Sequence, residues 1–250
     1  MTAPVFLADA DVLHDLAPGG TVGLSGPEGH HAAVVRRLRV GEELVLTDGR
    51  GCVVDGIVSS VGRDGLAVTA SRCRREPAPN PTLTVVQGVP KGDRGELAVE
   101  QLVEVGVDRI VPWWAERCVT QWRGDRAAKG LHRWRSAARE AGKQSRRWWA
   151  AEVTEPRQTA DVSRLLAGGA LAVVLHEDAE AALGSLTVPA VGELVLVVGP
   201  EGGISDEERA AFERVGAVAA RLGPTVLRTS TAGAVAAGLV LSRTSRWSFR

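Results

Sequence analysis

The residues best suited to chemistry lie in two loops near the end of the sequence. Residues 199–203 read Gly-Pro-Glu-Gly-Gly, and residues 222–228 read Leu-Gly-Pro-Thr-Val-Leu-Arg. Glycine tolerates positive φ and lets the backbone approach a ligand closely. The first loop lacks the lysine and the spacing of a phosphate-binding loop, and the acids Asp206 and Glu207 would repel an anion there. The loops are either plain turns or a binding site for a ligand other than a polyphosphate.

Regular elements are predicted to hold both loops at one edge of a sheet. The apolar run 194–198 predicts a buried strand before the first loop. Ser205 and Glu208 have the spacing of a capping box, which predicts a helix over about 206–216. A short strand over 218–222 precedes the second loop, and a helix rich in small residues follows it. Open α/β sheets bind ligands at such loops, beyond the carboxyl ends of their strands.

Upstream of these loops the same alternation of strands and helices continues. A strand over 83–89, a helix over 94–105 and a strand over 109–112 form a βαβ unit. Strands joined in this way are parallel. A strand over 171–175 runs into His176, which is either a general base or a hydrogen-bonded loop residue. The fold class is therefore α/β with a parallel sheet over residues 83–250.

The first 74 residues have a different pattern. Four short runs of alternating apolar residues are separated by turn signals: 21–24, 43–47, 51–59 and 66–71. Short strands at this spacing predict a small β-barrel domain. Residues 75–82 contain three prolines and are predicted to be the linker to the second domain.

Two basic segments are candidates for contact with RNA phosphates. A helix is predicted over 30–39, with a cluster formed by Arg36, Arg37 and Arg39. A longer basic helix is predicted over 125–149, where arginines alternate with Trp134, Trp148 and Trp149. Either segment is a cationic RNA-binding surface or an ordinary solvated helix face. The tryptophans are expected to be structural.

Composition narrows the functional classes. The 250 residues carry 30 basic and 30 acidic side chains, so the formal net charge is zero. No apolar run reaches the length of about 18 residues that a membrane span needs, and no signal peptide is recognised. Three widely spaced cysteines without a CxxC motif favour neither a zinc site nor disulfides. A cytoplasmic protein without metal and without a membrane partner is expected.

The two loops also carry a family resemblance. GPEGGIS at 199–205 and LGPTVLRTSTA at 222–232 resemble the signature of the SPOUT methyltransferases, and their spelling is most similar to the RsmE family. Further matches are the motif EAGKQSR at 140–146 and a run containing Lys91, Glu104, Gly106 and Arg117. The resemblance spans nearly the whole chain. It implies a trefoil-knot C-terminal domain that binds S-adenosylmethionine, a PUA-like RNA-binding domain over 1–74, and a homodimer.

For the site, the resemblance implies specific residues. Residues placed around the cofactor are Leu175, His176, Glu177, Gly199, Pro200, Gly202, Leu222, Gly223 and Leu227. Residues placed on the RNA are Arg36, Arg37, Arg39, Lys91, Arg117, Gln144 and Arg146. Arg228 and Glu201 are the catalytic candidates; Glu201 either pins its loop through backbone N–H groups or faces the substrate.

The implied reaction is methylation of N3 of a uridine in 16S ribosomal RNA of the small subunit. Uracil N3 holds a proton, so the site needs a base or a positive charge that stabilises the deprotonated ring. Arg228 is expected to supply that charge. The family commonly has glutamate where this chain has Ser230. Two other functions stay open: a catalytically silent RNA-binding factor of ribosome assembly, and a SPOUT enzyme that acts on tRNA or on a ribose hydroxyl.

Overall fold

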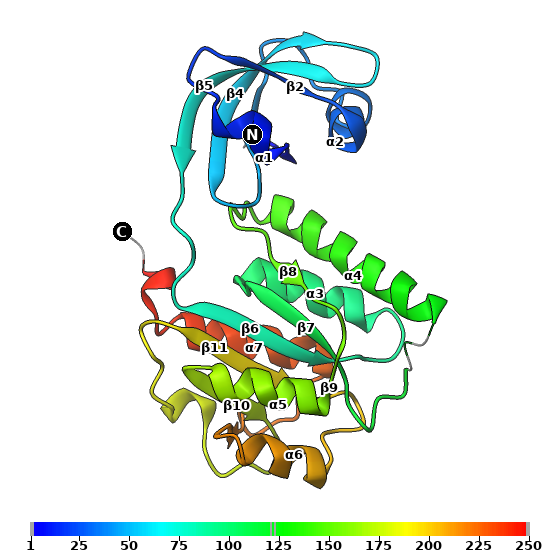
Figure 1. Ribbon diagram of the computed structural model, residues 1–250, viewed down its shortest axis with the longest axis vertical. Coiled ribbons are helices and arrows are strands. Elements are labelled where there is room, and N and C mark those ends of the chain that lie inside the picture. Colours follow the sequence, from blue (N-terminus) through cyan, green and yellow to red (C-terminus); the bar gives the residue numbers. More distant parts are fainter. Residues whose placement is uncertain (1–2, 121, 123, 249–250) are drawn as a thin grey trace. The chain divides into compact units, whose positions relative to one another are not determined.

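The computed structural model describes residues 3–120, 122 and 124–248, and the chain divides into two compact units (Figure 1). One comprises Met1–Ala78 and Gly142–Ala150, and the other comprises Pro79–Ala141 and Ala151–Arg250. The segment 142–150 thus groups with the N-terminal unit, although the sequence assigned it to the second domain. None of the described helices combines the length and the apolar character that a membrane crossing requires.

The first unit is built on a five-stranded sheet in the order β1-β3-β4-β5-β2. Its strands are β1 (Val5–Leu7), β2 (Thr21–Leu24), β3 (Glu43–Thr47), β4 (Cys52–Val61) and β5 (Leu66–Arg75), and α1 (Ala10–His14) follows β1. The four strands predicted from alternation are all present. The three-residue β1 was missed because it is too short to show a period, and it pairs in parallel with β3. Phe6 in β1 is buried in the core of this unit.

The helix predicted over 30–39 has different bounds. It begins as α2 (Gly26–His30), continues as the π-helical turn η1 (His31–Val35), and ends there. Arg37 adopts the left-handed φ of 54°, and the Leu38 N–H donates to the Ala32 carbonyl at 3.1 Å. The predicted arginine cluster therefore lies in the loop that follows the helix, where all three side chains are exposed: Arg36, Arg37 and Arg39.

The second basic helix also ends early. It is α4 (Asp125–Gln144), and the chain then leaves the helix at Arg146, whose φ is 56°. Lys143 belongs to this basic segment, but its side chain is only 9% exposed and its Nζ lies 2.9 Å from Oε1 of Glu28. This ion pair lies within the first unit and joins the segment after Ala141 to α2.

The tryptophans of this region are structural, as expected. Trp134 is buried in the core of the second unit. The guanidinium of Arg74 lies 5.4 Å from the ring centroid of Trp148, and the Trp149 Nε1–H donates to the carbonyl of Glu76 at 3.1 Å. Their rings are therefore held by the protein itself.

The second unit contains a seven-stranded parallel sheet. The order is β12-β10-β11-β6-β7-β8, and β9 also pairs with β7. The strands are β6 (Thr82–Gly88), β7 (Arg109–Trp114), β8 (Glu152–Val153), β9 (Arg157–Gln158), β10 (Leu171–Leu175), β11 (Glu193–Val198) and β12 (Val218–Ala220). The predicted α/β class with a parallel sheet is confirmed.

Helices cover both faces of this sheet because its buried strands are apolar on both sides. Helices α3 (Arg94–Val105), α4 and α7 (Thr229–Leu241) lie on one face, and α5 (Thr159–Gly168) and α6 (Asp206–Glu213) lie on the other (Figure 1). Leu196 of β11 belongs to the core cluster on the first face, and Val197 belongs to the cluster on the second. Helix α3 has the predicted bounds and stops at Gly106, which has a left-handed φ of 110°. Short 3₁₀ turns complete the unit: η2 (Leu183–Ser185) and η3 (Ser245–Trp247).

Candidate functional site

The carboxyl ends of β12, β10, β11, β6 and β7 are neighbours, so the loops that follow them gather at one edge of the sheet. The His176 N–H after β10 donates to the Ala220 carbonyl of β12 at 3.0 Å. Arg221 then exchanges backbone hydrogen bonds with residues 181–183 at the start of η2, donating to the Ala181 carbonyl and accepting from the Leu183 N–H, both at 2.9 Å. These hydrogen bonds anchor the loop 222–228 at the carboxyl end of β12, as predicted.

A buried chain of hydrogen bonds joins the two predicted loops. Thr229, the first residue of α7, donates its hydroxyl to the Gly199 carbonyl at 2.6 Å. Gln87 of β6 donates Nε2 to the same hydroxyl at 3.0 Å and to the Gly88 carbonyl at 3.1 Å. Gln87 is 0% exposed, and its Oε1 has no hydrogen-bond partner among the described residues. This chain fixes the start of α7 against the loop after β11.

The first loop is also seated on the end of β6. A Cβ added to Gly88 would lie 2.6 Å from the Pro200 nitrogen, so only glycine permits this approach. The carboxylate of Glu201 accepts the Lys91 N–H at 3.2 and 3.3 Å, and Nη1 of Arg94 lies 3.9 Å from it. These contacts favour the interpretation that Glu201 pins the loop.

On its other side the loop contacts the segment after β7. A Cβ on Gly202 would lie 2.7 Å from the Arg117 carbonyl oxygen, and one on Gly203 would lie 3.9 Å from Nη1 of Arg117. Of the predicted RNA contacts, Lys91 and Arg117 thus lie at this sheet edge. The others belong to the first unit: Arg36, Arg37, Arg39, Gln144 and Arg146.

The predicted cofactor residues offer apolar surface and open backbone. Three leucines are partly buried and pack against the core: Leu175, Leu222 and Leu227. Gly223 is exposed, and a Cβ there would meet nothing within 4 Å. Glu177 is exposed beside them. The combination suits a ligand that has an apolar part and whose net charge is not negative.

Two polar residues next to these leucines differ in accessibility. Arg228 caps the N-terminus of α7 with an exposed side chain, and its carbonyl accepts the Thr231 and Ala232 N–H groups at 2.8 and 2.9 Å. Ser230 is only 4% exposed. His176 accepts the Asp178 N–H through Nδ1 at 3.2 Å, which favours its interpretation as a hydrogen-bonded loop residue.

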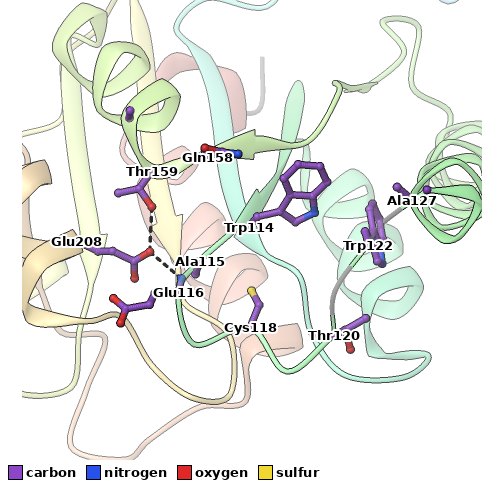
Figure 2. A pocket seen from close by; sticks show the side chains of 12 residues that line it. Trp114, Ala115, Glu116, Cys118, Thr120, Trp122, Ala127, Gln158, Thr159 and Glu208 are labelled. Carbon is purple, nitrogen blue, oxygen red and sulfur yellow. Dashed lines mark hydrogen bonds between the residues drawn. The ribbon is translucent and has the colours of Figure 1, made fainter.

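Sequence reasoning missed a cavity of about 660 Å³ at the carboxyl end of β7 (Figure 2). Its lining includes Trp114, Glu116, Cys118, Trp122, Gln158 and Glu208. The available signal was a second tryptophan at the end of β7 and polar residues where α5 begins. A tryptophan at the end of a strand is typical of a core residue, so no local pattern connects these segments.

Glu208 was predicted only as part of the capping box, which the structure confirms. Its buried carboxylate has a second function (Figure 2): Oε1 accepts the Glu116 N–H and the Thr159 hydroxyl, both at 2.9 Å. One carboxylate therefore ties α6 to the segment after β7 and to α5. Burial raises the pKa of the nearby Cys118 thiol, so this thiol stays protonated and adds no charge to that of the carboxylates in the cavity wall.

Comparison with known proteins gives consistent matches. The family model of an RNA methyltransferase domain matches residues 76–241, and that of an RNA methyltransferase PUA domain matches residues 24–70. Ribosomal RNA small subunit methyltransferase E of Mycobacterium bovis is 48% identical over 233 residues, which cover 92% of this chain and 89% of that protein. The Bacillus subtilis protein of the same name is 27% identical and covers 85% and 86%.

Two solved structures resemble the fold over its full length. Ribosomal RNA small subunit methyltransferase E from Neisseria gonorrhoeae, bound to S-adenosyl methionine, superposes with a TM-score of 0.86 and 25% identity over 99% of this chain and 100% of that one. A putative methyltransferase from Legionella pneumophila, in complex with the same cofactor, gives a TM-score of 0.86 and 27% identity, covering 98% and 99%.

Proposed function

This chain belongs to the RsmE family of ribosomal RNA small subunit methyltransferases, and we propose that it methylates N3 of a uridine in 16S ribosomal RNA with S-adenosylmethionine as the donor. Its C-terminal unit has the SPOUT trefoil-knot fold of that family. The observation that carries the proposal is the buried link from Gln87 through Thr229 to Gly199, because it holds the two predicted cofactor loops together.

The cofactor is proposed to bind between the loops after β10, β11 and β12. Leu175, Leu222 and Leu227 provide apolar surface for its adenosine and methionine parts, and the open backbone at Gly223 can read the adenine edge. The rest of the proposed set is His176, Glu177, Gly199, Pro200 and Gly202. When bound, S-adenosylmethionine supplies an electrophilic methyl group on a sulfonium. The carboxylate of Glu177 is compatible with that positive charge.

Arg228 is proposed to orient the uracil and to stabilise its deprotonated form. Its side chain is exposed, while its backbone is fixed as the N-terminal cap of α7. A fixed cation beside the acceptor favours the anionic ring before methyl transfer. Glu201 is proposed to be a positioning residue. Its carboxylate accepts a hydrogen bond from the Lys91 N–H and so holds the loop that contains Gly199 in place.

The N-terminal domain, residues 1–74, is proposed to bind RNA through the exposed Arg36, Arg37 and Arg39. Residues 75–82 are proposed as the linker to the methyltransferase domain, residues 83–250. Gln144, Arg146, Lys91 and Arg117 are proposed to contact the RNA as well.

The enzyme is proposed to act as a cytoplasmic homodimer. Sedimentation as a monomer at assay concentrations would contradict the dimer.

The test is methyl transfer with labelled S-adenosylmethionine to small ribosomal subunits that lack the modification, followed by nucleoside mass analysis. We expect 3-methyluridine. Methylation of tRNA or of a ribose hydroxyl instead would overturn the specificity. Cofactor binding without transfer to any RNA would support an assembly factor and overturn the enzymatic proposal.

The role of Arg228 is tested separately with Arg228→Ala and with Arg243→Ala as the control, because Arg243 is an exposed arginine just after α7. Arg228→Ala is expected to keep the fold and the cofactor affinity and to lose methyl transfer. Arg243→Ala should retain all three. Unchanged turnover of Arg228→Ala would refute this role.

A further inference from the structure

The cavity beside β7 is not part of the proposed cofactor site, because none of the residues assigned to the cofactor lines it. Its volume of about 660 Å³ lies within the range of sites that take small organic molecules. Figure 2 shows Glu208 and Thr159 at one end, Trp122 toward the other, and Trp114 between them. The cavity therefore has a polar end and an aromatic end.

The aromatic end is rigid. Trp122 packs edge-to-face on Trp134 with ring centroids 5.1 Å apart and an interplanar angle of 75°. A Cβ added to Gly130 would lie 2.5 Å from the Trp122 ring, so the missing side chain at Gly130 gives the indole its place. Trp122 is only 7% exposed, so it closes this end of the cavity as a fixed aromatic wall, against which a planar ring can pack with little loss of side-chain entropy.

The neighbouring tryptophans of β7 differ in their hydrogen bonding. The Trp113 Nε1–H donates to the Thr159 hydroxyl at 3.2 Å. Nε1 of Trp114 is buried and has no hydrogen-bond partner among the described residues. A buried donor without an acceptor is costly. A ring carbonyl or ring nitrogen of a ligand in the cavity would supply the missing acceptor after a small adjustment of the indole.

Charge selects the class of ligand. The carboxylates of Glu116 and Glu208 both line the cavity, and they disfavour a phosphate or another anion inside it. The exposed amide of Gln158 offers both a donor and an acceptor. Aromatic walls, hydrogen-bonding groups and negative charge together fit an uncharged planar heterocycle that carries N–H groups.

The cavity is next to the proposed reaction site. Glu116 and Cys118 line it, while Arg117 between them contacts Gly202 of the loop after β11. We propose that this cavity binds an unstacked nucleobase of the RNA substrate, with Trp114 and Trp122 as its aromatic walls. Unpaired bases are commonly recognised by stacking and by hydrogen bonds to their edges. The inference rests on the proposed function, because that function supplies the RNA.

Crosslinking tests occupancy directly. An RNA substrate carries 5-iodouridine at one position at a time, either at the methylated nucleotide or at a neighbour, and is irradiated with the full-length protein. We expect a crosslink to the peptide that contains Trp114 or Trp122 from one of these positions, and that position identifies the base. Crosslinks confined to other peptides would overturn the proposal.

Variants provide the second readout. Trp114→Ala is expected to raise the KM for RNA by about 5- to 150-fold, the loss expected for one base–aromatic stack, with the affinity for S-adenosylmethionine unchanged. Gln158→Ala is the test that does not depend on core packing, because Gln158 is exposed; it should raise the same KM. Trp247→Ala is the control, since Trp247 is 45% exposed and lies outside the cavity.

The two proposals fail in distinguishable ways. A cavity crosslink without methyl transfer would refute the proposed function and leave the base-binding site standing. Methyl transfer to uridine N3 with an unchanged KM in Gln158→Ala and in folded Trp114→Ala would refute the base-binding site alone. Thermal unfolding of each variant establishes which of them are folded.

Discussion

Removal of the Thr229 hydroxyl tests the link between the two loops. Thr229→Val keeps the shape of the side chain, but it deletes the donor to the Gly199 carbonyl at 2.6 Å and the acceptor of the Gln87 amide at 3.0 Å. Gln87 is fully buried and keeps only its 3.1 Å bond to the Gly88 carbonyl. Leaving buried polar groups unsatisfied costs about 1–3 kcal/mol, so the free energy of unfolding should fall by about that amount.

The functional consequence is expected in cofactor binding. Without the hydroxyl, the loop that contains Gly199 is no longer held to the start of α7, so Thr229→Val should bind S-adenosylmethionine more weakly by calorimetric titration. Thr229→Ser keeps both hydrogen bonds. It should lose only about 0.8 kcal/mol for the missing methyl group and should retain the cofactor affinity. Equal affinities of the valine and serine variants would refute the reasoning.

A double-mutant cycle isolates the bond itself. Gln87→Leu is expected to destabilise less than Thr229→Val, because it also removes an Oε1 that has no partner among the described residues. Combined with Thr229→Val, it should give a coupling energy of about 0.5–3 kcal/mol in urea unfolding, the range for residues in one buried network. A coupling energy of zero would contradict the proposed link.

Three further predictions concern the same unit. Gly88→Ala should lower the free energy of unfolding by about 1–3 kcal/mol and weaken cofactor binding, because the added Cβ would enter the loop after β11. Gly168→Ala should have neither effect, because a Cβ at Gly168 meets nothing within 4 Å. Arg246→Ala should lower the free energy of unfolding in urea by about 1.5–3 kcal/mol, the range for hydrogen bonds to charged groups, because it removes the guanidinium that binds Asp108 at 2.6 and 3.0 Å, while the Leu83 N–H still donates to this carboxylate; a loss below about 1 kcal/mol would contradict this. Burial raises the pKa of Cys118. The rate of its alkylation, measured by mass spectrometry from about pH 7 to pH 10, should therefore be lower than that of an ordinary thiol. The stability that the protonated thiol contributes should be lost as the pH rises through the raised pKa.

The local elements were largely predictable because local rules decide them. Helix α3 starts and stops as predicted, since Gly106 supplies the left-handed C-terminal residue that ends it. The capping box at Ser205 set the start of α6. The predicted ends of the two basic helices were wrong, because Arg37 and Arg146 adopt positive φ and the chain leaves the helix there. Arginine gives no local signal for that conformation, so tertiary contacts decided it.

Local patterns along the chain were enough to predict the parallel α/β class, the two glycine loops and their place after neighbouring strands, because periodicity and turn residues are local properties. Packing in three dimensions brings Gln87 of β6 to Thr229 and makes residues near 114, 122, 158 and 208 enclose one cavity. These contacts join segments far apart in the chain. Their partners are selected by strand order and by the packing of side chains in three dimensions, which no local pattern contains.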